Sequence, residues 1–136
     1  MELNTYITFG GQCEAAFRFY ERILGGKITM MLTHAETPAV QHVPKDWQGK
    51  IMHARLQFGD RSLMACDAPP GRYEPAKGFH VQVGFSDATE ADRIYHALAA
   101  NGKETMPIQE TFWAARFGML VDQFGIPWMI NCDKAA

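Results

Sequence analysis

FGGQCEAAFRFYERILGGK, residues 9–27, returns in altered form as FSDATEADRIYHALAANGK, residues 85–103. A shift of 76 residues (9 to 85) aligns a Phe, an internal Glu-Ala pair and a closing Gly-Lys pair. A shift of 66 residues (58 to 124) aligns FG at 58–59 with 124–125, and CD at 66–67 with 132–133. Matches of this kind indicate a duplicated supersecondary unit. The sequence therefore predicts two tandem copies, with an insertion between residues 35 and 50 of the first.

The composition is that of an ordinary globular domain. Of the 136 residues, 47% are hydrophobic and 21% are charged, and the formal net charge is −2. A chain of this size can bury a core without metals or disulfides, and its charge gives no sign of nucleic-acid or membrane partners. We find no apolar run of membrane-spanning length and no signal-peptide pattern. An odd count of three cysteines predicts free thiols. We therefore expect a cytoplasmic protein.

The first copy predicts a strand, a helix and three further strands. Apolar and polar residues alternate over residues 3–9, which is typical of a half-buried strand. Apolar residues then recur at helical spacing as Ala16, Phe19, Tyr20 and Ile23, and two glycines at 25–26 end the pattern. The predicted elements are Leu3–Phe9, Cys13–Leu24, Lys27–Thr33, Ile51–Phe58 and Ser62–Cys66.

The second copy repeats this order. We predict a strand at Phe79–Phe85, a helix capped by Asp87 or Thr89 and ending near Asn101, and strands near 104–112, 115–122 and 127–132. Prolines and glycines crowd the segment between the copies, which predicts a linker. We therefore expect one domain over residues 1–136, with units at about 1–67 and 79–133 and a linker at 68–78.

Four stretches carry a resemblance to a known family: YITFGG (6–11), AFRFYERILGG (16–26), IMHARL (51–56) and DQFGIPW (122–128). With the tandem element order, they make the chain resemble the vicinal oxygen chelate superfamily, which includes glyoxalase I, bleomycin-resistance proteins and extradiol dioxygenases. The PhnB-like branch is the most similar. The resemblance implies an α+β fold of two βαβββ units, a curved eight-stranded mixed sheet around a central cleft, and a homodimer.

The resemblance also places four metal-ligand positions in that cleft, at Asn4, Leu63, His80 and Met129. Iron, manganese, nickel and zinc in such sites take imidazole and carboxylate ligands. His80 alone supplies such a donor, and both carboxylate positions are apolar. We therefore expect no metal and no other cofactor. A divalent metal, as the alternative, would use His80.

Without a metal, the predicted cleft is apolar with a few polar groups. Strand alternation turns Asn4, Tyr6 and Thr8 away from the helix layer, because their neighbours Ile7 and Phe9 must face it. A pocket of this character is the usual form of a small-molecule site, although simple solvent exposure is the alternative for any one residue. The candidate ligand-binding residues are Asn4, Tyr6, Thr8, His53, Arg55, His80, Gln82, Trp113, Phe117, Met119 and Met129.

Two functions are compatible with this set. The first is a metal-independent protein that binds a small planar or aromatic compound in the cleft between the repeat units of a dimer, because aromatic and thioether side chains accommodate flat ligands. The second is a metal-dependent lyase, isomerase or dioxygenase, in which His80 serves as metal ligand or general base and Tyr6 or Arg55 stabilises an oxyanion. Arg55 has two possible roles, a bidentate contact to a substrate carboxylate or phosphate, or a structural salt bridge.

Other histidines show no shared spacing. We expect His34, His42 and His96 on the surface. The insertion, which contains Trp47, has no counterpart in the second copy and is a candidate dimer contact or lid.

The cysteines are predicted to be structural. Cys13 lies near a helix N-terminus with no obvious base beside it, so we expect a buried filler. Cys66 and Cys132 correspond under the 66-residue shift, and alternation predicts that both face the helix layer.

Overall fold

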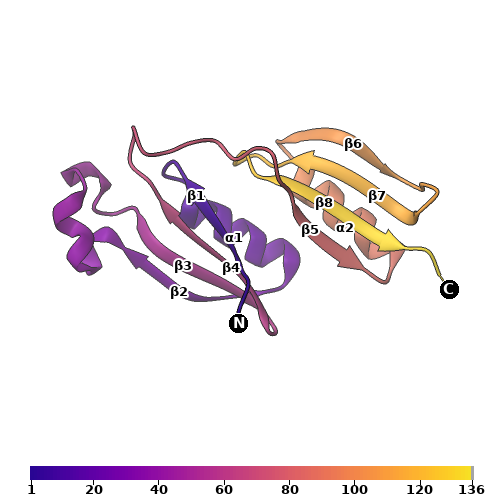
Figure 1. Ribbon diagram of the computed structural model, residues 1–136, viewed down its shortest axis with the longest axis horizontal. Coiled ribbons are helices and arrows are strands. Elements are labelled where there is room, and N and C mark those ends of the chain that lie inside the picture. The colour runs from indigo at the N-terminus through magenta and orange to yellow at the C-terminus, as the bar shows by residue number, and fades with distance from the viewer. Residues whose placement is uncertain (136) are drawn as a thin grey trace. The chain divides into compact units, whose positions relative to one another are not determined.

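The computed structural model describes residues 1–135 and divides after Pro75 into two compact units. We call the segment up to Pro75 unit 1 and the segment from Ala76 onward unit 2. Each unit contains one α-helix and four strands, and Figure 1 shows each helix crossing one face of its own sheet. Within residues 1–135, no helix is long and apolar enough to cross a membrane.

In unit 1 the sheet has the strand order β1-β4-β3-β2. The first strand runs parallel to the last, and the remaining neighbours are antiparallel. Three short 3-10 helices, η1 (His34–Glu36), η2 (Pro38–His42) and η3 (Lys45–Trp47), occupy the insertion. The main elements are β1 (Thr5–Phe9), α1 (Cys13–Leu24), β2 (Lys27–Thr33), β3 (Ile51–Phe58) and β4 (Arg61–Asp67).

Unit 2 has the same topology, with the strand order β5-β8-β7-β6. Here too the first strand is parallel to the last and the others are antiparallel. The predicted α+β fold of two βαβββ units is therefore confirmed, and the eight strands pair as two four-stranded mixed sheets. The elements are β5 (Val81–Phe85), α2 (Ala88–Ala99), β6 (Lys103–Gln109), β7 (Ala114–Val121) and β8 (Pro127–Asp133).

The first helix was predicted to the residue, and the second was predicted two residues too long. In α2, Asp87 is the N-cap, and its carboxylate accepts a hydrogen bond from the backbone N–H of Thr89 at 2.9 Å. Gly25 follows α1 in the left-handed conformation, and Asn101 adopts the same conformation at the matching position beyond α2. Asparagine is the residue after glycine that tolerates this conformation best. The left-handed residue is the C-cap itself after α1, whereas after α2 it follows the C-cap residue Ala100.

The core of each unit lies between its helix and its sheet. In unit 1, the ring of Phe9 packs edge-on against Phe17 of α1, with 6.3 Å between the ring centroids. In unit 2, the hydroxyl of Tyr95 in α2 donates to the backbone carbonyl of Met106 at 2.9 Å, and burial raises the pKa of this phenol. The largest fully buried side chains are Trp128, Tyr20, Tyr95, Phe9, Phe17, Leu56, Ile94, Leu98, Leu120, Ile130 and Cys13.

The repeat also preserves a glycine at the start of the second strand. A Cβ atom on Gly26 would lie 2.9 Å from the carbonyl oxygen of Gln57, and one on Gly102 would lie 2.9 Å from Cα of Asp122. Both glycines therefore sit where a neighbouring strand end passes too closely for any side chain. This close approach explains the Gly-Lys match between residues 26–27 and 102–103.

A buried carboxylate joins distant parts of unit 1. Asp67, at the end of β4, accepts hydrogen bonds on Oδ1 from the N–H groups of Gly11 and Cys13, each at 3.0 Å. Its Oδ2 accepts from the N–H of Ile51 at 2.9 Å. Asp67 thus fixes the turn into α1 and the first residue of β3 from a side chain that is 3% exposed.

His34 is buried, contrary to the sequence prediction. Its side chain is 7% exposed, its Nε2 lies 3.4 Å from the carbonyl oxygen of Asp67, and its Nδ1 has no hydrogen-bond partner among residues 1–135. The insertion folds back over the end of β3, and the N–H of His34 donates to the carbonyl of Lys50 at 2.9 Å. Spacing along the chain carries no signal for such a local fold.

We predict that Asp67→Asn lowers the free energy of unfolding by about 2–4 kcal/mol, because an amide must turn a donor towards at least one of three buried N–H groups. Urea denaturation of the purified protein measures this loss. Asp60→Asn, in the exposed β3–β4 turn, is the matched control and should shift stability by about 0.5 kcal/mol or less. Equal effects from the two substitutions would contradict the role assigned to Asp67.

Candidate functional site

Each sheet has one face that its own helix leaves uncovered, and we call this its open face. In unit 1, the helix side takes the buried residues Ile7, Ala54 and Leu63. Alternation places the intervening side chains on the open face. Those in the predicted site are Tyr6, Thr8, His53 and Arg55, and three neighbours from β4 join them: Ser62, Met64 and Cys66. Asn4 precedes β1 and is connected to this face by a hydrogen bond from Ser62.

Tyr6 and His53 form a stacked pair on this face. Their ring centroids are 5.8 Å apart with 29° between the ring planes, and the Tyr6 hydroxyl lies 3.3 Å from Nδ1 of His53. Although 46% of Tyr6 is exposed, partial burial raises the pKa of its phenol, and the nearby Cys66 thiol adds to the effect. The hydroxyl therefore stays protonated and able to donate at neutral pH.

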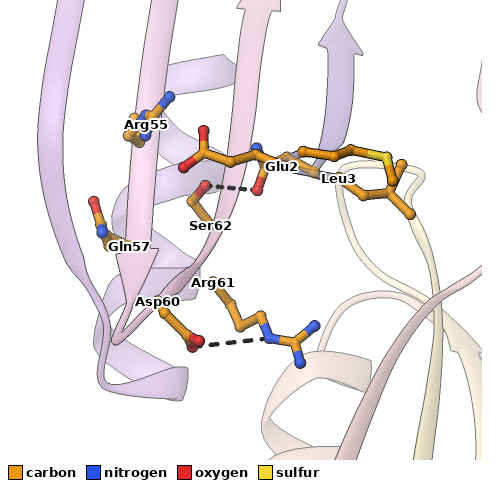
Figure 2. Close-up of a pocket in the computed structure, with 9 residues that line it drawn as sticks. Glu2, Leu3, Arg55, Gln57, Asp60, Arg61 and Ser62 are labelled. Carbon is orange, nitrogen blue, oxygen red and sulfur yellow. Dashed lines mark hydrogen bonds and ion pairs between the residues drawn. The ribbon is translucent and has the colours of Figure 1, made fainter.

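A polar hollow of about 250 Å³ lies at the other end of the open face of unit 1. Ser62 donates to Oδ1 of Asn4 at 3.1 Å, and one guanidinium N–H of Arg55 points to the sulfur of Met64 at 3.4 Å. Figure 2 shows Glu2 reaching into this hollow from the N-terminal segment. The lining residues are Met1, Glu2, Leu3, Asn4, Arg55, Gln57, Asp60, Arg61 and Ser62.

In unit 2, the open face carries a row of methionines. Gln82 of β5 is level with Met129 of β8, Met129 with Met119 of β7, and Met119 with Met106 of β6. Residues at the same level on neighbouring strands point to the same face. The result is a flexible, polarisable surface that ends in one amide side chain.

Aromatic rings lie at one end of this methionine row. Trp113 packs against Phe117 with 5.3 Å between ring centroids, and Phe112 packs against Trp113 at 4.8 Å. Phe112 is 88% exposed and Trp113 is 47% exposed. Exposed aromatic groups of this kind mark surfaces for ligands or partners. The structure thus brings Phe117, Met119 and Met129 onto one face, with Trp113 at its rim.

His80 lies just outside the strand in which it was predicted. Strand β5 begins at Val81, and His80 is exposed in the segment before it. Gln82, two residues further along, is exposed on the open face. His80 therefore lies next to β5, at the edge of the open face of unit 2.

The register of the last strand corrects one predicted ligand position. Leu63 pairs with Thr5 and is buried on the helix side, whereas Met64 pairs with Tyr6 on the open face. The matching residue in β8 is Met129, which pairs with Gln82. The correct correspondence in this strand is therefore a shift of 65 residues (64 to 129), one less than the sequence match suggested.

Unequal turns explain this error. Phe58 pairs with Arg61, so the β3–β4 turn holds only two residues, whereas Val121 pairs with Pro127 across a longer β7–β8 turn. The two FG pairs match in sequence but lie at different places in their turns. A slip of one residue moves a side chain to the other face of a sheet. Cys66 accordingly lies on the open face beside Thr8, and only Cys132 faces the helix layer as predicted.

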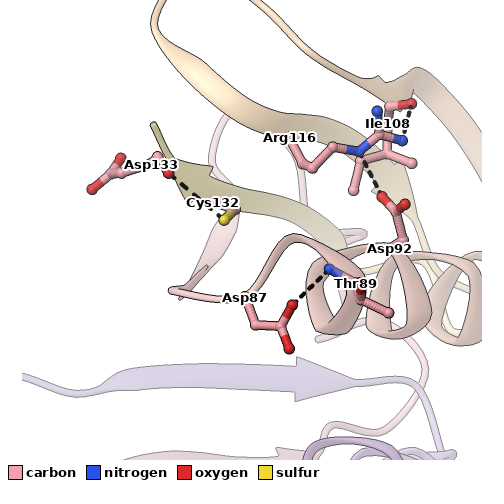
Figure 3. A network of polar contacts seen from close by, with 7 residues as sticks. All are labelled: Asp87, Thr89, Asp92, Ile108, Arg116, Cys132 and Asp133. Atoms are coloured by element: carbon pink, nitrogen blue, oxygen red, sulfur yellow. Dashed lines mark hydrogen bonds and ion pairs between the residues drawn. The ribbon is translucent and has the colours of Figure 1, made fainter. Parts of the chain in front are cut away.

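On the helix side of unit 2, polar groups serve the fold. Figure 3 shows Arg116 of β7 reaching α2, where its Nε donates to Asp92 at 2.7 Å, and a second guanidinium nitrogen lies 3.3 Å from the carbonyl of Ile108. This arginine is tied to the scaffold by a carboxylate and a carbonyl. We assign it a structural role.

The donor set does not suit the divalent metal that the family resemblance implies. With the register corrected, the four positions are held by Asn4, Met64, His80 and Met129, which give one imidazole and no carboxylate. Among residues 1–135, no three His, Cys, Asp or Glu side chains gather closely enough to hold a metal ion. Thioethers favour soft ions such as copper(I) over the metals that activate oxygen.

The tandem units and their open faces define a fold, and sequence comparison assigns the family. The chain belongs to the Glyoxalase/Bleomycin resistance protein/Dioxygenase superfamily, whose model matches residues 2–130. It is 35% identical to Protein YjdN of Escherichia coli (strain K12), over 98% of this chain and 97% of that protein.

Two solved structures show the same fold. Protein PA1353 of Pseudomonas aeruginosa aligns with a TM-score of 0.91 and 42% identity, covering 99% of each chain. A Bacillus cereus PhnB protein, described as a putative 3-demethylubiquinone-9 3-methyltransferase, aligns with a TM-score of 0.80. It is 20% identical and covers 97% of this chain and 99% of that one, so this second likeness concerns the fold alone.

The cysteines provide a test of the open face. Burial raises the pKa of the Cys13 thiol, with Asp67 adding to the effect, and Cys132 is 2% exposed. Cys66 is half-buried on the open face. We predict that the folded protein reacts with about one equivalent of a thiol reagent at pH 8, because a protonated, buried thiol is inert. Cys66→Ser should abolish this reaction and Cys132→Ser should leave it; fast labelling of the folded Cys66→Ser variant would contradict the assignment.

Proposed function

We propose that this chain is a metal-independent small-molecule binding protein of the PhnB-like glyoxalase and bleomycin-resistance type, and that it holds its ligand against the open faces of its sheets. The single observation that carries the proposal is the chemistry of these faces. Met119 and Met129 lie level with one another, and Phe117 and Trp113 pack beside them. Apolar, polarisable side chains with a few polar groups are typical of small-molecule sites.

The polar groups on these faces favour orientation of a ligand over catalysis. The Tyr6 hydroxyl lies within hydrogen-bonding distance of Nδ1 of His53 in a partly exposed stack, and Ser62 is bonded to Asn4. A stacked phenol and imidazole offer a flat ring a surface of matching shape. At the four family ligand positions, the imidazole of His80 and the thioethers of Met64 and Met129 come with no carboxylate that would hold an oxygen-activating metal.

We also propose that the functional form is a homodimer. Phe112, Trp113, Tyr6 and Met30 are all exposed by more than 40%. Burial of apolar surface favours association by roughly 25 cal/mol per Å². A second copy would remove part of this surface from water. Multi-angle light scattering at micromolar concentration should give twice the chain mass, and a monomer would contradict this part of the proposal.

Metal independence can be measured directly. A thermal-shift screen of aromatic metabolites and drugs should identify stabilising compounds, because a ligand raises the melting temperature in proportion to the logarithm of its concentration. We expect each to bind with unchanged affinity after exhaustive chelation, in a protein that elemental analysis shows to be free of stoichiometric iron, manganese, nickel and zinc. Loss of binding on chelation, with recovery on adding one metal, would favour the metal-dependent enzyme.

The aromatic rim gives a second expectation. We predict that Trp113→Ala weakens binding of a compound found in this screen by about 2- to 10-fold, the usual value of one aromatic contact. Phe112→Ala should have a smaller effect, since Phe112 is the more exposed of these two rings. Titration calorimetry with both variants measures which substitution weakens binding more. An unchanged affinity for Trp113→Ala, with the fold intact by circular dichroism, would exclude the rim from the site.

A further inference from the structure

Arg55 occupies the middle of the open face in unit 1. It lies on β3 between β4 and β2, level with Met64 on one side and Met30 on the other. Its chain neighbours Ala54 and Leu56 are fully buried on the helix side. The guanidinium therefore emerges among thioethers on the face that we assign to the ligand.

This guanidinium lacks the carboxylate partner that four other arginines of the chain have. Its side-chain contact is the Met64 sulfur at 3.4 Å, and a thioether is a weak acceptor. Within residues 1–135, no carboxylate lies within ion-pairing distance of Arg55. Such pairs are made by Arg18, Arg61, Arg93 and Arg116. The structural salt bridge that the sequence analysis gave as the alternative role of Arg55 is thus absent from the described residues.

The surroundings of Arg55 supply further donors. The hydrogen bond from Ser62 uses the carbonyl oxygen of Asn4, so the Asn4 amide protons are left for another acceptor. Both residues line the same hollow as Arg55, and Gln57 lines it too. On the other side of Arg55 along β3 stands His53, stacked on Tyr6. A hollow that holds guanidinium and amide donors beside the carboxylates of Glu2 and Asp60 therefore adjoins a flat aromatic surface.

We propose that Arg55 binds an anionic group of the ligand, a carboxylate or a phosphate-type oxyanion, whose apolar or aromatic body rests on the adjoining Tyr6–His53 stack. The planar fork of a guanidinium matches two oxygens of such a group. The inference rests on the proposed binding function and narrows its ligand class to organic anions. Glu2, whose carboxylate enters the same hollow (Figure 2), opposes the binding of an anion there.

The test compares three probes that share one ring: benzoate, phenylphosphonate and the neutral benzamide. Each is titrated by NMR into the full-length protein at low ionic strength. We expect benzoate or phenylphosphonate to bind at least about tenfold more tightly than benzamide. Arg55→Gln should remove this preference through a loss of about 10- to 100-fold, as expected for a hydrogen-bonded charge. Arg55→Lys, which keeps the charge without the fork, should lie in between.

Two further variants control the result. Arg22→Gln removes an exposed arginine from α1 on the opposite side of the sheet and should change nothing. Glu2→Gln should tighten binding of the anion, because it removes a negative charge from the hollow. An unchanged or weaker affinity would show that the anion does not bind in this hollow.

The outcomes separate this inference from the function on which it rests. If neutral and anionic rings bind equally well, or if Arg55→Gln retains the anion preference, the anion site is wrong and the binding function stands. If no compound of either charge binds to the folded protein, both are wrong. Circular dichroism of each variant confirms that the fold is intact before titration.

Discussion

The fold of unit 1 depends on one buried carboxylate. Asp67 satisfies the N–H groups of Gly11, Cys13 and Ile51, which belong to the turn before α1 and to the start of β3. Three buried donors on one acceptor are costly to leave unpaired. The end of β4, the helix and the central strand are therefore held in one arrangement. In unit 2, Asp122 plays a comparable part in the β7–β8 turn, where it accepts from the N–H of Ile126 and from the indole of Trp128.

This arrangement buries one face of each sheet and leaves the other for function. With the helix fixed on one side, every second residue of β1, of β4 and of the middle of β3 is committed to the core, and the residues between them lie on the open face. Such positions accept polar and soft side chains freely. Arg55 shows the contrast most clearly, because Arg116 on the equivalent strand of unit 2 turns to the helix side and is tied to Asp92. The same residue type is structural on one face and available for a ligand on the other.

The sequence predicted element order, both helices and the strand faces well, because these depend on local periodicity and on glycines whose role is steric. The prediction failed in β4, because the β3–β4 and β7–β8 turns differ in length and the units are therefore not in the register that the sequence match suggested. It named Leu63 where Met64 lies on the open face, and it placed Cys66 on the helix side although Cys66 lies on the open face. It also missed the burial of His34, since this residue is held by contacts with Asp67 and Lys50, which are distant along the chain. Of the predicted ligand-binding residues, those within strands lie on the open face of their own unit, whereas Asn4, His80 and Trp113 lie just before the strands that follow them. That these residues bind a ligand is a prediction.

Methionine methyl groups offer the most direct test of the central claim, that the open faces bind a small molecule without a metal. The protein would be labelled at its methionine methyl groups, freed of metal by chelation and titrated with the tightest compound from the thermal-shift screen. The account predicts that the signals of Met119 and Met129, which lie level with one another on one open face, shift together and saturate on titration. Saturable binding that leaves both signals unmoved, or shifts that appear only after a divalent metal is added, would contradict it.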